Sequence, residues 1–118
     1  MNIKNYITLT TDVKEPTVGN NGYSLDIYSP VDLYLNPGAH IDINSGFILN
    51  LPDNIFGVLA PKVHLSDKFE VTSGQIIHPG HDKEIKLTLK YSKSSISYLK
   101  AGEPLLQIVF LHGIKLDA

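Results

Sequence analysis

Short segments in which apolar and polar residues alternate constrain the fold of this chain more than any other feature. In the clearest segment, Ile85, Leu87, Leu89 and Tyr91 alternate with Lys86, Thr88 and Lys90. A period of two puts one set of side chains on one face of a β-strand and the other set on the opposite face. We therefore expect a strand with a buried apolar face and a solvated face that carries the lysines.

Further segments carry a strand signal. Tyr23, Leu25 and Ile27 alternate with Ser24 and Asp26, and Val31, Leu33 and Leu35 alternate with Asp32 and Tyr34. The stretch from Leu105 to Leu111 is apolar except for Gln107, which indicates a strand buried on both faces. No segment holds a helical apolar period over three turns, so we expect at most a turn or two of helix.

Groups of residues that favour turns separate these segments. They are Asn20 to Gly22, Asn36 to Gly38, Pro52 to Asn54, Pro79 to Gly80 and Ala101 to Gly102. Such spacing is typical of a compact β-sandwich or barrel. Because 118 residues suit one domain, we expect a single all-β domain that spans residues 1–118.

The composition argues against several classes of partner and site. Ten Lys and Arg against twelve Asp and Glu give a net charge of −2, with no basic stripe for a phosphate backbone, so we expect no nucleic-acid partner. The absence of cysteine excludes disulfides and thiolate metal sites. The N-terminal residues lack the apolar region of a signal peptide, and no apolar run is long enough to span a membrane. We expect an intracellular protein, cytoplasmic or nuclear.

A series of short motifs in a fixed order carries the most specific signal. Between residues 35 and 64 it comprises Asn36 to Gly38, Ser45 and Gly46, Leu51 and Pro52, Phe56 and Gly57, and Ala60 to His64. Asp26 lies in an earlier segment, from Pro16 to Asp32, and Gly102 to Ile108 form a later one, GEPLLQI. In order and spacing these segments resemble the motifs of the dUTPase and dCTP deaminase superfamily. The resemblance implies a distorted jelly-roll or β-clip barrel of antiparallel strands, and a homotrimer with sites between neighbouring subunits.

The third motif departs from the family's pattern at the positions of its base. Where dUTPases carry the Asp that deprotonates the attacking water, this chain has His78, and the Tyr that stacks beneath the deoxyribose is replaced by His81. The deaminase branch uses a Glu on the next strand as proton shuttle, and Thr88 holds that position. The resemblance therefore implies that the base of neither branch is present, and we expect no catalytic residue.

Several of the side-chain groups with which the family binds a triphosphate are also missing from this sequence. The family's Arg and Ser of the second motif correspond to Lys62 and Val63, so the guanidinium fork and the hydroxyl are lost and a point charge remains. The fourth motif keeps Gln107 and Gly102, and the glycine-rich fifth motif has no counterpart. We interpret a set of six residues as a vestigial nucleotide pocket without a cofactor: Asp26, Lys62, His64, His78, His81 and Gln107.

The three histidines of this set bear on the possibility of a metal site. His64, His78 and His81 could converge, and histidines three residues apart in a loop can chelate a metal. No carboxylate or other fourth ligand is evident, so a structural or surface role is preferred and we expect no metal site. Asp26 could hold a cation, although on an alternating strand a solvated or turn-capping carboxylate is the preferred interpretation.

Three functions stay open. The first is an inactive dUTPase-like protein that acts as an interaction or accessory module with an unidentified protein partner, similar to viral accessory proteins such as the adenoviral early proteins that kept the fold. Leu116 and Ala118 do not reproduce the PDZ-binding tail of some of those. The second is an active dUTP pyrophosphatase or dCTP deaminase with Mg²⁺ as cofactor, in which His78 replaces the base. The third is a structural or decoration protein of a virion.

Overall fold

The computed structural model describes residues 1–62 and 67–118, and nearly all of its regular structure is β-strand. In chain order the elements are the 3₁₀-helix η1 (Ile3–Tyr6) and the strands β1 (Ile7–Leu9), β2 (Thr17–Val18), β3 (Ser24–Tyr28), β4 (Leu33–Leu35), β5 (His40–Leu49), β6 (Ile55–Ala60), β7 (Phe69–Ser73), β8 (Ile76–Ile77), β9 (Glu84–Tyr91), β10 (Ser97–Leu99) and β11 (Pro104–His112). The prediction of an all-β fold with little helix is confirmed.

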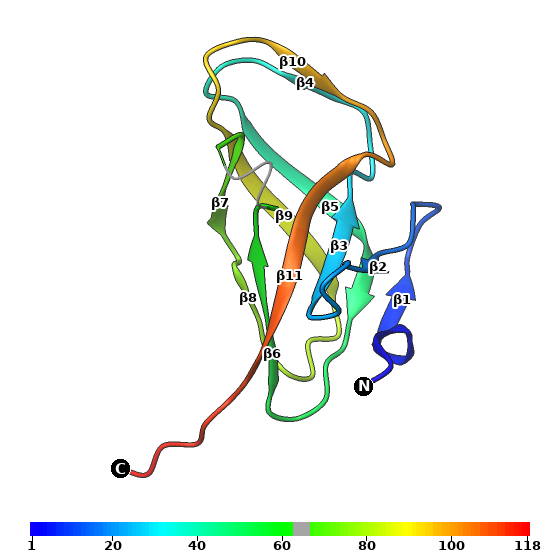
Figure 1. Cartoon of the computed structure of the whole chain (residues 1–118), viewed down its shortest axis with the longest axis vertical. Coiled ribbons are helices and arrows are strands. Elements are labelled where there is room, and N and C mark those ends of the chain that lie inside the picture. The colour runs from blue at the N-terminus through cyan, green and yellow to red at the C-terminus, as the bar shows by residue number, and fades with distance from the viewer. Residues whose placement is uncertain (63–66) are drawn as a thin grey trace.

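The strands form three antiparallel sheets (Figure 1). A four-stranded sheet has the order β1-β5-β9-β7, a five-stranded sheet has the order β2-β3-β11-β6-β8, and β4 pairs with β10 in a separate ribbon. The two larger sheets face each other, whereas the β4-β10 ribbon lies beyond them at one end of the molecule (Figure 1). Neighbours such as β3 and β11 are far apart in the sequence, as in a jelly roll.

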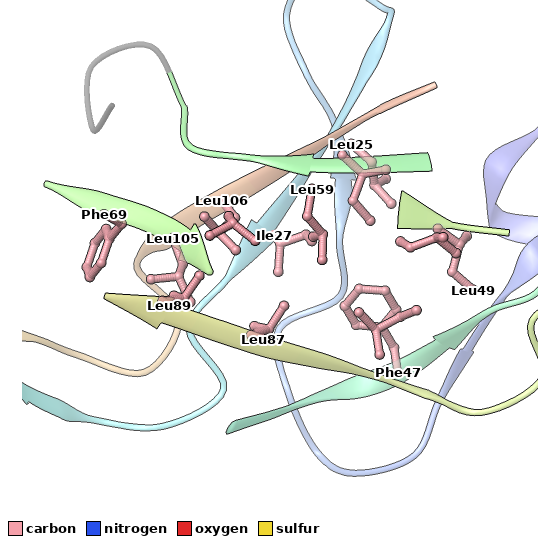
Figure 2. Close-up of a cluster of buried hydrophobic side chains, with 14 of the residues drawn as sticks. Leu25, Ile27, Phe47, Leu49, Leu59, Phe69, Leu87, Leu89, Leu105 and Leu106 are labelled. Carbon is pink, nitrogen blue, oxygen red and sulfur yellow. The ribbon is translucent and has the colours of Figure 1, made fainter. Parts of the chain in front are cut away.

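The hydrophobic core fills the space between the two larger sheets. Strand β9 shows how alternation produces it, because Ile85, Leu87, Leu89 and Tyr91 are at most 3% exposed whereas Lys86 faces solvent. In the core they lie with Phe47, Leu49 and Phe69 of the same sheet, and Leu25, Ile27, Leu59, Leu105 and Leu106 come from the side of the five-stranded sheet (Figure 2). Since burial of each such side chain is worth about 1.5 to 3 kcal/mol, this cluster supplies the main driving force for folding.

A β-bulge in β5 ties the N-terminal segment to the four-stranded sheet. The pairing of β5 with β9 shifts between Asn44 and Ile48, and Gly46 within the bulge has φ +88°, a conformation that favours glycine. Its carbonyl accepts a hydrogen bond of 2.8 Å from the backbone N–H of Thr10. A Cβ on Gly46 would lie 2.7 Å from Cγ1 of Val13. Both the backbone conformation and the neighbouring segment therefore require glycine here.

Strand β11 is central in the five-stranded sheet. It pairs with β3 over residues 104–109 and with β6 over residues 107–112. The inward side chains of its first half are buried, but the prediction that the strand is buried on both faces is wrong at Leu111, which is 54% exposed in the single chain. Leu111 pairs with Phe56 beyond the first residue of β3, so its side chain lies on a face that no second layer covers.

Two apolar residues of the predicted alternating segments lie outside the strands. Tyr23 is 81% exposed because β3 begins only at Ser24, and Val31 is 44% exposed because β4 begins only at Leu33. The five predicted turn groups all fall between strands. In the part of the chain that the structure describes, no helix is long and apolar enough to cross a membrane.

Candidate functional site

Asp26, Gln107 and Ala60 occupy one row across three neighbouring strands. Asp26 in β3 pairs with Gln107 in β11, and Gln107 pairs with Ala60 in β6. Side chains of paired residues lie on the same face of an antiparallel sheet. This face is the outer one, because Leu25 and Ile27 on either side of Asp26 point into the core. The register thus brings together the first, second and fourth motifs.

Lys62 joins this row through an ion pair. Its Nζ lies 3.0 Å from Oδ2 of Asp26, and the two side chains are only 21% and 16% exposed. The Nε2 of Gln107 donates a hydrogen bond of 3.1 Å to the carbonyl O of Pro61, which fixes the backbone immediately before Lys62. Because both charges are largely removed from water, their attraction is stronger than that of an exposed pair. Three of the six predicted site residues are therefore in one group.

Three further residues, which the motifs do not single out, lie beside Asp26. Thr17 of β2 pairs with Asp26, and its hydroxyl lies 2.6 Å from the hydroxyl of Tyr28. The Nζ of Lys14 lies 3.9 Å from the centroid of the Tyr28 ring, which is a cation–π contact. Tyr28 could have been found from its position two residues after Asp26 on the same strand face. Lys14 and Thr17 carry no such signal.

His78 and His81 bracket a tight turn between β8 and β9. The N–H of His81 donates to the carbonyl O of His78 at 3.3 Å, and Gly80 has φ +75°, as expected for Gly at the third position of a turn after Pro. The N–H of Gly80 donates to the carbonyl O of Leu51 at 2.9 Å. The His78 ring meets Phe56 edge to face with 5.6 Å between centroids, so it is held against the start of β6.

Within one chain the six predicted residues do not share a single pocket. Phe56, which contacts His78, and Ala60, in the row of Asp26, are four positions apart on β6, which corresponds to about 13 Å of strand. Asp26, Lys62 and Gln107 form one group at the end of β6, and the two histidines form another at its start. His64 lies outside the described residues.

The acidic residues around the histidine turn are dispersed. Asp82 next to His81 is exposed, and Glu84 accepts a hydrogen bond from the hydroxyl of Thr10. Thr88 lies in the other sheet, where it pairs with Asp42 of β5. Across residues 1–62 and 67–118, no group of three or more His, Asp or Glu side chains is arranged to hold a metal ion.

Comparison with solved structures identifies this architecture. The dUTPase of Staphylococcus bacteriophage 80alpha matches with a TM-score of 0.81 over 95% of this chain and 92% of that chain, at 15% identity. A mutant dUTPase of phage phi11 of S. aureus, whose structure concerns a structural Mg(II) ion, matches with a TM-score of 0.80 over 95% and 92% at 15% identity. The 80alpha dUTPase with dUpNHpp matches with a TM-score of 0.75 over 95% and 84%, again at 15% identity. The chain has the dUTPase fold.

The dUTPase fold confirms the jelly-roll arrangement that the motifs implied. No protein-family model matches the chain, and no curated protein sequence matches it. The similarity to these structures, at 15% identity, shows the arrangement of the strands. The chemistry of the site depends on the side chains that this protein carries.

Proposed function

We propose that this chain is a dUTPase-fold protein that does not hydrolyse nucleotides and that acts, as a homotrimer, through a protein partner. The Lys62–Asp26 ion pair carries this proposal. A nucleoside triphosphate needs an electropositive site, but the cation at the second-motif position is compensated by a carboxylate 3.0 Å away. A second cation on this face, Lys14, lies over the Tyr28 ring. The polar face is therefore a weak site for a polyanion.

The histidine turn supports the same conclusion. A general base is efficient when a second group orients it by a hydrogen bond. The ring of His78, at the position that the resemblance assigns to the base, is packed edge to face against Phe56. Phe56 is apolar and offers no such hydrogen bond, so a histidine here does not replace an oriented carboxylate.

Regulatory roles of similar proteins also support the proposal. Phage dUTPases with this fold control transfer of virulence genes by a proto-oncogenic G protein-like mechanism. Proteins of this architecture therefore act on processes other than nucleotide hydrolysis. A chain with the fold and without the catalytic groups is suited to a role of that kind.

An exposed aromatic surface is available for a partner. Tyr34 of β4 and Tyr98 of β10 are paired in register, and their ring centroids are 4.7 Å apart. The two residues are 78% and 40% exposed, and Ile96 nearby is 74% exposed. Tyrosines often provide much of the binding energy of protein interfaces, because they combine a large apolar area with a polar tip. We assign contact with the partner to this ribbon.

The absence of turnover is tested by measuring pyrophosphate and ammonia release from dUTP and dCTP with millimolar Mg²⁺. We expect turnover below about 0.1 s⁻¹, under the usual enzyme range of roughly 1 to 10³ s⁻¹. Faster turnover that disappears in His78→Ala would contradict the proposal and make that histidine the base. The Asp82→Asn variant tests in the same assay whether the exposed carboxylate of this loop acts as the base instead.

The partner is tested by affinity capture with the whole chain as bait and a Tyr34→Ala, Tyr98→Ala variant as matched bait. We expect the wild-type bait to retain a protein in stoichiometric amount and the variant to bind it at least about tenfold more weakly. Equal binding by both baits would exclude the ribbon. If the wild-type bait retains no protein, the proposal that the protein acts through a protein partner is contradicted.

A further inference from the structure

Two carboxylates lie beside the tyrosine pair of the β4-β10 ribbon. Desolvation raises the pKa of the Tyr98 phenol, and so do its hydrogen bond to the carboxylate of Asp32 and the nearby charges of Asp32 and Glu103. Both carboxylates are therefore close to the rings. The ribbon lies beyond the two larger sheets at one end of the molecule (Figure 1), so its tyrosines and carboxylates together form an exposed acidic and aromatic surface.

Backbone hydrogen bonds hold both carboxylates in place. Oδ1 of Asp32 accepts a hydrogen bond of 2.8 Å from the N–H of Ala101. Oε1 of Glu103 accepts one of 3.1 Å from the N–H of Lys100. A carboxylate has about four acceptor positions, so each of them can accept a further donor. Because the acidic groups are positioned before a partner arrives, less entropy is lost when one binds.

The negative charge of this surface is only partly compensated. Within the described ranges, neither Asp32 nor Glu103 forms an ion pair. Lys100 is the only basic residue between positions 99 and 104, and its exposed side chain pairs with neither carboxylate. Two negative charges thus accompany one positive charge beside the tyrosines. Such an excess favours a cationic group over a neutral or anionic one.

The tyrosine pair offers a cation a second kind of contact. The rings of Tyr34 and Tyr98 are inclined at 39° to each other, and Tyr34 is mostly exposed, so much of its ring is open to a ligand. The face of an aromatic ring attracts a cation. A guanidinium group can stack on such a ring and also pair with a carboxylate through two N–H groups, whereas an ammonium group is a strongly hydrated point charge. Arginine therefore suits this surface better than lysine.

We propose that the ribbon binds an arginine side chain of the protein partner, with the guanidinium over the exposed ring of Tyr34 and paired with the carboxylate of Asp32. Glu103 adds to the attraction for a basic segment around that arginine. This inference rests on the proposed function, which assigns contact with a partner to the ribbon, and it names the chemistry of that contact. The partner then presents a basic surface with at least one accessible arginine.

Titration of the full chain with short peptides tests the site without the partner. The probes are the tripeptides Gly-Arg-Gly and Gly-Lys-Gly with blocked ends, and the readout is the NMR signals of the Tyr34 and Tyr98 rings. We expect saturable shifts at millimolar arginine peptide, and binding of the lysine peptide that is at least about threefold weaker. Added salt should weaken binding of the arginine peptide.

A charge-removing variant and a matched control make the titration specific. Asp32→Asn keeps an oxygen that can accept the hydrogen bond from Ala101 but removes the charge, so we expect binding of the arginine peptide to weaken at least about fivefold. Asp42→Asn is the control, because Asp42 is also exposed but lies on β5 of the four-stranded sheet. Its titration should match that of the wild type.

Several results would overturn the arginine contact. They are the absence of shifts with the arginine peptide, equal binding of the two peptides, and unchanged binding by Asp32→Asn. Equal shifts with methyl glucoside would also overturn it, because they would show that the tyrosines bind a neutral sugar.

Affinity capture separates this inference from the proposed function. With Asp32→Asn as bait, we expect the partner to bind at least about fivefold more weakly than to the wild type. A partner retained equally by both baits would overturn the arginine contact and leave the proposed function intact. A wild-type bait that retains no protein would contradict the proposed function, whereas the peptide titration would still decide whether the ribbon binds arginine.

Discussion

Lys62 and Asp26 form an ion pair between segments that are not neighbours in the sheet, because the lysine follows β6, the aspartate lies in β3, and β11 runs between them. Gln107 of β11 lies in the same row and bonds to the carbonyl of Pro61. The outer face of these three strands is therefore joined by side chains as well as by backbone hydrogen bonds.

Replacement of Lys62 should destabilise the fold. We expect Lys62→Met to lower the free energy of unfolding by about 1 to 2 kcal/mol, because Asp26 then stays partly buried without its partner. Urea unfolding followed by circular dichroism measures the change. Lys93→Met is the control, since it breaks the exposed pair with Asp67 and should leave unfolding unchanged. Equal stability of Lys62→Met and the wild type would show that the pair adds nothing.

Gly46→Ala should lower the free energy of unfolding by about 1 to 3 kcal/mol, because φ is +88° and the new Cβ would meet Val13. Adding Val13→Ala should recover the steric part of the loss. Gly38→Ala is the matched control, since its φ is +74° and the space around it is open, so only the backbone strain applies. Thermal unfolding compares the stabilities of the variants. Similar losses of stability for Gly46→Ala and Gly38→Ala would show that the clash with Val13 contributes nothing.

The assembly should be a homotrimer. Its outer-face apolar side chains, including Ile76 and Leu111, are more than half exposed in the single chain, and burial of about 800 Å² per partner is the size of a stable interface. Light scattering should give a mass three times that of the 13.0 kDa chain. A species of one chain mass at micromolar concentration would contradict this.

The phenol of Tyr98 should ionise at a higher pH than that of an ordinary tyrosine. Desolvation, followed by its hydrogen bond to the carboxylate of Asp32, raises the pKa of the Tyr98 phenol. The stabilisation linked to the neutral phenol is present below the usual tyrosine pKa and is lost as the pH rises through the raised value. Ultraviolet titration of the wild type and Tyr98→Phe should show that the late-ionising phenol is the one removed. Loss of an early-ionising phenol instead would contradict the assignment.

The untagged protein should not retain zinc. His78 and His81 lie in one turn, and in the described parts of the chain no third ligand gathers with them, whereas zinc sites use three or four protein ligands. Metal analysis after dialysis against a mild chelator measures this. One zinc per chain after that step would be the contrary result.

Local alternation made the strands predictable but not their partners. Strand β9 follows its alternating pattern residue by residue. In contrast, the sequence of residues 24–28 does not indicate that they pair with residues 104–109, because strand pairing depends on packing between distant segments. Residues 31–35 alternate as clearly as a core strand, and Tyr34 is exposed and Leu35 buried as the alternation predicts, yet β4 belongs to the separate ribbon. Alternation therefore predicts which residues lie on each face of a strand, but it does not predict which sheet the strand joins.

The candidate site was predictable where the motifs reflect register. Asp26, Lys62 and Gln107 come from distant segments and lie together, whereas their role in a nucleotide pocket stays a prediction. Lys14 was not predictable, because a long side chain reaches Tyr28 from an irregular segment. Motif spacing also did not predict the direction of the His78 ring, which packing against Phe56 decides.

The position of β11 has a consequence for synthesis of the protein. It follows every other strand in the chain, yet it joins β3 to β6 in the five-stranded sheet. On the ribosome, β3 and β6 emerge with open edges on the sides that β11 later occupies, since the strand between them has not yet been made. Such intermediates are prone to aggregation. The nascent chain therefore needs protection until residues 104–112 have emerged, and the five-stranded sheet closes only after translation of β11.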